Sequence, residues 1–330
     1  MFFRDREEYE DYLRQNEIED YEIGKDNYFE WNEDGYILLQ RNKFTKSARD
    51  MSYYTNCETW VLLNDKVTMA LIKYPFGDKY RNLSIDEYYK SIYNNILLPQ
   101  ISKQFQNESA KYFLAKKDNK GKKQRVEQTY ILTKDFKRKN EELIHGEEIL
   151  EENNADIREL NIDVLIKNIE IYLKRENFNN VDIERIRREF IKQSLDNRFK
   201  KQVDENNHNW GIIVNNRFKT ARIAPMYDLD CCCEMGKLSK HRRMTNDGSL
   251  DSLESIVNQY KNEEWFKKYL EEVMTSFNIE KAFKDAKEET KFDIPEKYKN
   301  QYRDFFARRK KELENAYKKI YQAKEEEIER

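Results

Sequence analysis

Short apolar runs alternate with polar turns in the first part of the chain. YILLQRNKF (36–44), TWVLLND (59–65) and VTMALIKYP (67–75) are rich in aliphatic, β-branched and aromatic residues, a pattern typical of strands. Polar residues 64–66 form a turn between the last two runs. Two later runs, AKYFLAKK and VEQTYILTKDF, flank the lysine-rich turn KDNKGKKQR and predict another hairpin. We therefore expect antiparallel strands here.

One helix is predicted between these strands, over LSIDEYYKSIYNNILLPQI (83–101). Ser84 is placed as its N-cap, and Glu87 three residues later completes a capping-box pattern. The acidic opening, residues 1–22, predicts a further short helix from its apolar spacing. The residues expected on the inner face of the longer helix are Ile85, Tyr88, Tyr89, Ile92 and Ile96.

After Phe136 the apolar residues recur at steps of three and four, which indicates helices. NWGIIV and TARIAPMYDLD, joined by a turn at Asn215 and Asn216, interrupt them as a β-hairpin. The chain is therefore predicted to be an α+β protein of two lobes: a small antiparallel β-rich N-lobe with one helix (1–136) and a mostly helical C-lobe (137–330). The helices expected in the second lobe cover 162–177, 181–199, 250–262, 263–275, 278–290 and 295–328.

Composition supports a folded protein with an aromatic core. Charged residues make up 38% of the 330 residues, but 22 Tyr, 18 Phe and 4 Trp supply large apolar rings, each burying roughly 150–250 Å². We expect a tyrosine-rich core beneath a charged surface.

The charge balance excludes several classes of partner. Lys and Arg total 61 against 63 Asp and Glu, so no bulk attraction to nucleic acid or an anionic membrane is expected.

No apolar run is long enough for a membrane helix, and the acidic start is unlike a signal peptide. We expect a cytoplasmic protein, although such a sequence is compatible with secretion as an effector. The four cysteines include no CxxC pair, so neither a disulfide framework nor structural zinc is predicted.

The segment VDENNHNWGII (203–213) carries the strongest candidate chemistry. Asp204 and Asn209 are five residues apart, the spacing of the proton-accepting aspartate and the magnesium-binding asparagine in protein kinases. Asn209 begins one hairpin strand and Asp228 follows the other, so antiparallel pairing brings an amide oxygen and a carboxylate together. Mg²⁺ prefers such oxygen ligands. Asp204 alone would be read as a capping or turn residue.

A cation for the phosphates is expected from the first lobe. Lys73 lies in the predicted strand ALIKYP and shares a face with Leu71. Leu71 is placed under adenine, Lys73 on the phosphates, and Glu87 as the partner that orients Lys73. A plain capping role remains the alternative for Glu87.

Five segments in order, ALIKYP, IDEYYKSIY, TYILTKDF, VDENNHNWGII and RIAPMYDLD, resemble the HipA-like serine/threonine kinases, most closely the compact CtkA-type branch. The resemblance covers roughly residues 35–235. It implies a bilobal protein-kinase-like fold in which the hairpin is catalytic, ATP and Mg²⁺ as cofactors, and a protein Ser/Thr hydroxyl as acceptor. The implied roles are catalytic base for Asp204, metal ligands for Asn209 and Asp228, phosphate contact for Lys73 and its orientation for Glu87.

Further positions follow from the resemblance. The adenine hinge is placed at Thr133, Lys134 and Asp135, and the phosphate-covering loop within KFTKSARDMSYYT (43–55). Asp230 would add a third metal ligand if the chain after Asp228 is extended. Within that loop, the backbone N–H groups of Ser47, Ala48 and Arg49 and the Arg49 guanidinium are expected to contact the phosphates.

Two departures from the family pattern keep other functions open. The loop 43–55 contains no glycine, and Glu205 and Asn206 replace the family's basic pair beside the catalytic aspartate. One alternative is a lipid or small-molecule kinase of the same fold. The other is a pseudokinase that binds nucleotide and acts as an interaction module.

Overall fold

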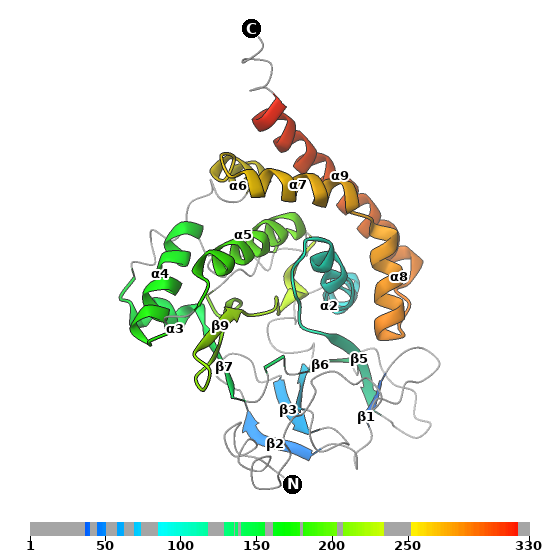
Figure 1. Cartoon of the computed structure of the whole chain (residues 1–330). Coiled ribbons are helices and arrows are strands. Elements are labelled where there is room, and N and C mark those ends of the chain that lie inside the picture. The colour runs from blue at the N-terminus through cyan, green and yellow to red at the C-terminus, as the bar shows by residue number, and fades with distance from the viewer. Residues whose placement is uncertain are drawn as a thin grey trace.

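The computed structural model describes the backbone of the ranges 37–39, 45–50, 58–62, 69–73, 85–117, 129–134, 136–137, 140–155, 161–178, 181–202, 207–233 and 252–322. A six-stranded sheet lies at one end of the molecule, and the helices fill the rest (Figure 1). A three-stranded sheet lies beside the helices α3 (Gly146–Glu152) and α5 (Ile183–Lys200) (Figure 1). The architecture is α+β, as predicted. The expected helix over 1–22 lies outside the described residues.

The larger sheet has the order β1-β5-β6-β4-β3-β2. Every neighbouring pair is antiparallel except β1 and β5, which run parallel. The first predicted strand, β1, is therefore an edge strand that runs parallel to its neighbour, whereas an antiparallel strand was expected. Its partner β5 comes from far along the chain and not from an adjacent hairpin. The strands are β1 (Ile37–Leu39), β2 (Thr45–Asp50), β3 (Glu58–Leu62), β4 (Met69–Lys73), β5 (Tyr112–Lys117) and β6 (Thr129–Lys134).

Part of the predicted phosphate-covering loop is a strand. Ser47, Ala48 and Arg49 lie in β2, at the other edge of the sheet. The register of β2 against β3 shifts between Lys46 and Asp50, so pairing is irregular where these three residues lie. A shift of this kind leaves backbone groups unpaired in an otherwise regular ladder. The expectation of a loop was wrong for 45–50.

The helix α2 (Ile85–Gln104) begins next to the predicted cap. Ser84 itself lies outside the described residues. Ile92 and Ile96 are buried as expected, and Tyr89 is partly buried. The Asn94 side chain of α2 bonds to the second half of the chain. Its Nδ2 donates to the carbonyl of Asp230 at 2.9 Å, and the Tyr302 hydroxyl donates to its Oδ1 at 2.8 Å. α2 therefore packs among the later helices and not on the sheet alone (Figure 1).

The smaller sheet has the order β7-β8-β9, all antiparallel. The hairpin of β8 (Gly211–Asn215) and β9 (Thr220–Ile223) confirms the prediction, including its turn at Asn215. β7 (Glu141–His145) was missed, because its two aliphatic residues stand in a charged segment that reads as helical. The pairing of β7 with β8 joins positions far apart in sequence, which no local pattern signals.

The later helices agree with the apolar periodicity. α4 and α5 begin at Asn161 and Asp182, whose side chains accept hydrogen bonds from the backbone N–H three residues on, as N-caps do. Asn278 caps α8 in the same way. The elements are α3 (Gly146–Glu152), α4 (Ile162–Arg175), α5 (Ile183–Lys200), the 3-10 turn η4 (Leu229–Cys231), α6 (Leu253–Gln259), α7 (Glu264–Ser276), α8 (Ile279–Thr290), α9 (Glu296–Tyr317) and the π-helical turn η6 (Lys318–Gln322).

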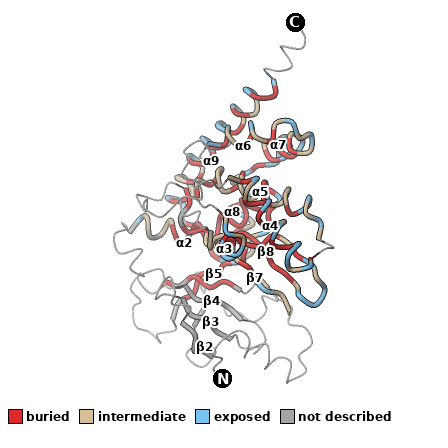
Figure 2. Tube along the Cα trace, turned by 90° about the vertical axis from the view of Figure 1, so that its left-hand side faces the viewer, coloured by how far each residue is buried: buried red, intermediate tan, exposed pale blue. Residues whose placement is uncertain are grey.

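Aromatic rings form much of the core, as the composition predicted. Phe199 at the end of α5 lies 4.8 Å from Phe105, 5.0 Å from Phe277 and 5.6 Å from Phe306, measured between ring centroids. The buried residues form a continuous band through α2, α5, β8 and α9 (Figure 2). The end of α5, which leads into the candidate loop, is thus fixed within the core. Among the described helices none is long and apolar enough to cross a bilayer.

Candidate functional site

Residues 207–210 connect the region after α5 to β8, and the junction of β7 with α3 holds their backbone. Gly146 N–H donates to the carbonyl of Trp210 at 2.9 Å, and Glu147 N–H donates to that of Asn207 at 3.0 Å. The Trp210 indole donates to Asn207 Oδ1 at 3.3 Å. The segment that carries Asn209 is therefore fixed on both sides.

Two glycines make this close approach possible. A Cβ added at Gly146 would lie 2.1 Å from the Trp210 ring, and one at Gly211 would lie 2.4 Å from the carbonyl oxygen of Ile144. Both distances are far below van der Waals contact. Gly211 thus allows a tight backbone approach, and Trp210 is buried.

The chain after β9 returns alongside this segment. Ala224 N–H donates to the carbonyl of Gly211 at 3.0 Å, and Tyr227 donates its hydroxyl hydrogen to the carbonyl of His208 at 2.6 Å. On its other side the returning segment pairs with the residues after α2. Met226 N–H donates to the carbonyl of Glu108, and Ala110 N–H donates to the carbonyl of Met226. Asn209 therefore lies just before the first strand of the hairpin and Asp228 follows the second, the order that the sequence predicts.

The backbone of Asp228 has a left-handed conformation, with φ 55°, a region that aspartate enters more readily than most residues. Two contacts hold it there. Its N–H donates to the Tyr112 hydroxyl at 2.9 Å, and its carbonyl accepts from Gln202 Nε2 at 2.9 Å. Tyr112 belongs to β5 and Gln202 follows α5, so the turn at Asp228 is held by both halves of the structure.

Asp230 lies in the 3-10 turn η4, not in an extended segment. The geometric reason for predicting it as a third metal ligand is therefore wrong. It is nonetheless buried, with 2% of its surface exposed, and its Oδ1 has no hydrogen-bond partner among the described residues. A buried carboxylate oxygen without a partner is costly, and a bound cation would satisfy it.

The side-chain oxygens of Asn209, Asp228 and Asp230 suit a Mg²⁺ ion that also binds phosphate and water, rather than a metal ion bound by protein side chains alone. Within the described residues, no cluster of three or more His, Cys, Asp or Glu side chains could hold a metal ion. Magnesium in nucleotide sites is bound through one or two carboxylates, with phosphates and water as the other ligands. Asn209 and Asp228, both partly exposed, with Asp230 nearby in sequence, are such a set.

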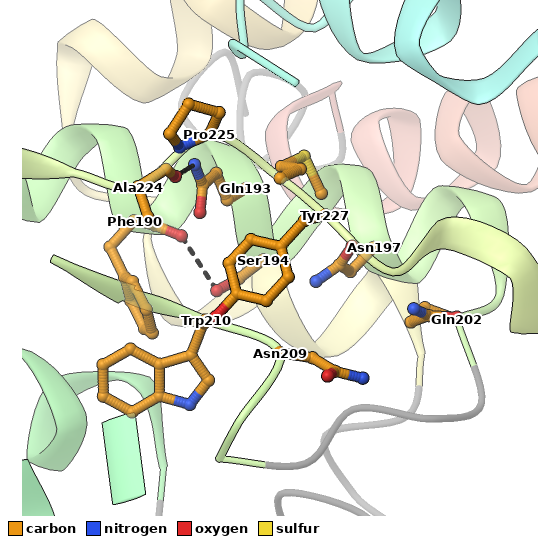
Figure 3. Close-up of a pocket in the computed structure, with 11 residues that line it drawn as sticks. Phe190, Gln193, Ser194, Asn197, Gln202, Asn209, Trp210, Ala224, Pro225 and Tyr227 are labelled. Atoms are coloured by element: carbon orange, nitrogen blue, oxygen red, sulfur yellow. Dashed lines mark hydrogen bonds between the residues drawn. The ribbon is translucent and has the colours of Figure 1, made fainter. Parts of the chain in front are cut away.

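A small pocket lies between α5 and the segment 224–227. Asn209 and Gln202 line it at the same end, with Asn197 of α5 beside them and the Tyr227 ring across it (Figure 3). The opposite end is apolar, with Phe190, Trp210 and Pro225 (Figure 3). The predicted metal ligand Asn209 thus stands at the polar end of a hollow beneath the candidate loop.

Burial shifts the pKa of two side chains around the loop, His145 and Tyr227, toward the neutral form. Burial lowers the pKa of His145, against the opposing effect of its hydrogen bond to the His208 carbonyl. Burial also raises the pKa of Tyr227 well above its usual range. The His208 side chain lies with its Nε2 2.6 Å from Glu147 Oε2 and is one-third exposed.

A buried ion pair precedes the loop. Lys200 Nζ lies 3.1 Å from Asp196 Oδ2 and donates to Ser102 at 2.8 Å, and the side chains of Lys200 and Asp196 are fully buried. Arg309 of α9 donates to the carbonyls of Arg198 and Phe199, in the last turn of α5 where carbonyls lack helical partners. These contacts fix the end of α5.

The predicted nucleotide-binding positions are described in part. Asp204 and Asp135 lie outside the described residues. Leu71 and Lys73 lie in β4, and the backbones of Leu71, Thr133 and Tyr112 are in register across β4, β6 and β5. The Tyr112 hydroxyl accepts a hydrogen bond from the backbone N–H of Asp228. The strand predicted to contact adenine, β4, is therefore two strands away in the sheet from β5, which contacts the predicted metal-ligand turn.

The hinge residues Thr133 and Lys134 belong to strand β6. Thr133 is buried and its hydroxyl donates to the carbonyl of Lys111 at 2.9 Å. Its backbone is in register with Leu71 of β4 on one side and Tyr112 of β5 on the other. Glu87 is half-buried in the first turn of α2. Its contact with Lys73 stays a prediction, because the Lys73 side chain lies outside the described residues.

Sequence reasoning missed the groups that hold the site in place: Tyr112, His145, Glu147 and Gln202. None carries a motif of its own. Tyr227, by contrast, lies in the segment RIAPMYDLD, directly before Asp228.

No protein-family model matches the chain, and no curated protein sequence matches it. Among solved structures, the Helicobacter pylori proinflammatory kinase CtkA superposes with a TM-score of 0.62 at 14% identity, over 87% of this chain and 98% of that one. HipA from Shewanella oneidensis MR-1, solved with HipB and operator DNA, gives 0.46 at 12% identity, over 77% of this chain and 58% of that one. The predicted resemblance to CtkA is confirmed for the fold: the chain has the fold of this kinase.

Proposed function

We propose that the protein transfers a phosphoryl group from Mg-ATP to a hydroxyl, with a protein serine or threonine as acceptor. One observation carries the proposal. The residues next to Asn209 and Asp228, His208 and Tyr227, are joined by a 2.6 Å hydrogen bond, so two oxygen ligands suited to Mg²⁺ follow adjoining backbone segments. The likeness in fold to a protein that is itself a kinase supports this choice of chemistry.

In this proposal Asn209, Asp228 and Asp230 hold the cation and Asp204 accepts the proton of the acceptor hydroxyl. Bound Mg²⁺ neutralises phosphate charge. Lys73, oriented by Glu87, contacts the phosphates, and residues 47–49 contribute backbone N–H groups where β2 is irregular. Leu71 and residues 133–135, at the end of β6, contact adenine. Catalysis rests on positioning and charge neutralisation.

The proposal is tested by intact mass and ADP release after incubation with Mg-ATP. The wild type is expected to gain mass in steps of one phosphate or to phosphorylate a peptide mixture. Asp204→Ala is expected to lower turnover roughly 10²–10⁴-fold while nucleotide binding persists. Asp228→Asn, which keeps the size of the side chain, is expected to weaken the Mg²⁺-dependent part of binding.

Three outcomes separate the proposal from its rivals. ADP release with small alcohols or lipids but not with peptides would assign another acceptor. Thermal stabilisation by Mg-ATP without ADP or added phosphate would identify a nucleotide-binding module. Normal turnover in Asp204→Ala would contradict the assignment of the base.

A further inference from the structure

The carbonyl oxygen of His208 accepts two side-chain hydrogen bonds. The Tyr227 hydroxyl donates from 2.6 Å and His145 Nδ1 lies 2.9 Å away. Because a carbonyl can only accept, this contact requires the proton on Nδ1 of His145. His145 Nδ1 also lies 3.1 Å from the Tyr227 hydroxyl oxygen. Three groups from β7, the candidate loop and the segment after β9 thus meet at one point.

The neighbouring peptide groups are held by the same junction. The carbonyls of Asn207 and Trp210 accept from the backbone N–H groups of Glu147 and Gly146. With the contacts to His208, three of the four carbonyls from 207 to 210 have defined donors. The direction in which the Asn209 side chain leaves the backbone is set by these contacts.

Tyr227 connects this frame to the other predicted metal ligand. The next residue is Asp228, whose N–H and carbonyl are bonded to Tyr112 and Gln202 at 2.9 Å each. The Tyr227 ring is stacked on Phe136, 5.7 Å between centroids at 24°, which limits its rotation. The hydroxyl of Tyr227 is therefore a direct side-chain link between the segment of Asn209 and that of Asp228.

We infer that Tyr227 and His145 are positioning residues that fix the separation of the two metal ligands through the His208 carbonyl. The inference rests on the proposed function, since it concerns the magnesium that the nucleotide brings. Residues that orient metal ligands without touching the metal commonly change metal affinity 10–100-fold when replaced. The hydroxyl of Tyr227 is expected to act in this way, with His145 supporting it.

The test is a Mg²⁺ titration of nucleotide binding by Tyr227→Phe, with a fluorescent ATP analogue. The concentration of Mg²⁺ at half-saturation is expected to rise about 10-fold or more, while binding without Mg²⁺ stays unchanged. Tyr269→Phe is the matched control, because the hydroxyl of Tyr269 in α7 also donates to a buried carbonyl, that of Phe105, at 2.9 Å. It is expected to leave the Mg²⁺ dependence unchanged.

A second variant pair examines His145. His145→Leu removes the Nδ1 donor and is expected to raise the Mg²⁺ concentration at half-saturation. In His145→Asn the amide nitrogen would lie near the same place, and the Mg²⁺ concentration at half-saturation is expected to return part of the way to the wild-type value. Amide hydrogen exchange of residues 207–213 without nucleotide gives a readout independent of activity, with faster exchange expected in Tyr227→Phe and His145→Leu.

The outcomes are distinguishable. Equal Mg²⁺ dependence in Tyr227→Phe, His145→Leu and the Tyr269→Phe control would overturn the inference while the proposed function stands. A wild type that binds no nucleotide at any Mg²⁺ concentration would overturn the proposed function and the inference with it. If Tyr227→Phe fails to fold, the His145 pair decides.

Discussion

The hydroxyl oxygen of Tyr112 in β5 lies 2.9 Å from the backbone nitrogen of Asp228, and accepts its hydrogen bond. This contact joins the six-stranded sheet to the turn that carries a predicted metal ligand. Since Asp228 has a positive φ, the bond also offsets the cost of that conformation, which for a residue other than glycine is of order 1–3 kcal/mol.

Tyr112→Phe is expected to lower the free energy of unfolding by about 1–3 kcal/mol, because it leaves the Asp228 N–H without its acceptor. The apparent affinity for Mg-nucleotide is expected to fall as well. Urea unfolding and nucleotide titration measure the two effects.

Tyr172→Phe is the control for this change. Tyr172 in α4 is buried and burial raises the pKa of its hydroxyl to about 12, yet it stands outside the candidate site. A loss of stability in Tyr112→Phe no larger than in Tyr172→Phe would contradict a structural role for the contact.

The buried pair of Lys200 and Asp196 gives a prediction on stability. Lys200→Met is expected to cost about 3–5 kcal/mol, because it leaves the Asp196 carboxylate buried and unpaired. The double variant Lys200→Met with Asp196→Leu is expected to recover much of this loss. Chemical denaturation of the three proteins measures the coupling.

An exposed pair shows the contrast. Lys174 and Glu170 form an i,i+4 pair on α4, with 67% and 37% of their side chains exposed. Lys174→Met is expected to cost only about 0.3–0.5 kcal/mol. Similar losses in Lys174→Met and Lys200→Met would show that the buried charge is not the cause.

Steric contact between Gly146 and Trp210 gives a third prediction. Gly146→Ala places a methyl group where the Trp210 ring now lies, so the loop 207–210 must move, at a cost of about 1–3 kcal/mol. Thermal unfolding and nucleotide binding are both expected to weaken. The smaller ring of Trp210→Phe, combined with Gly146→Ala, is expected to relieve part of the clash, and strictly additive effects in this double-mutant cycle would contradict it.

Local signals in the sequence were sufficient for most helices and for one hairpin. Asn161, Asp182 and Asn278 are caps that the structure uses, and the polar turn at Asn215 joins β8 to β9. Each of these features depends on residues a few positions apart. Periodicity and capping chemistry act at that range, so the sequence alone could specify them.

Pairing over long distances could not be predicted in the same way. β7 was missed and β1 was expected to be antiparallel, and both pair with strands far along the chain. Residues 45–50 were expected to form a loop and instead pair with the next strand, in a shifted register. The candidate site shows the same division. Asn209 and Asp228 could be found from spacing, but Tyr112, His145 and Gln202 reach them from other elements, and nothing adjacent to these three residues in sequence signals the contact.

The pH dependence of stability follows from His145. Burial lowers its pKa, with nearby His208 and Lys137 acting in the same direction and Glu148 opposing them. In the unfolded chain a histidine has a pKa of about 6.5. As the pH falls, the unfolded chain therefore binds a proton at His145 before the folded protein does.

The wild type is thus expected to keep the full contribution of neutral His145 above about pH 7 and to lose it as the pH falls from about 6.5 through the lower pKa of the folded state. His145→Asn has no proton to bind and should lose less stability over that interval. Urea unfolding at steps between about pH 8 and 5 compares the two slopes. Parallel slopes would mean that the folded protein protonates His145 as readily as the unfolded chain, and that the imidazole is not held neutral against the His208 carbonyl.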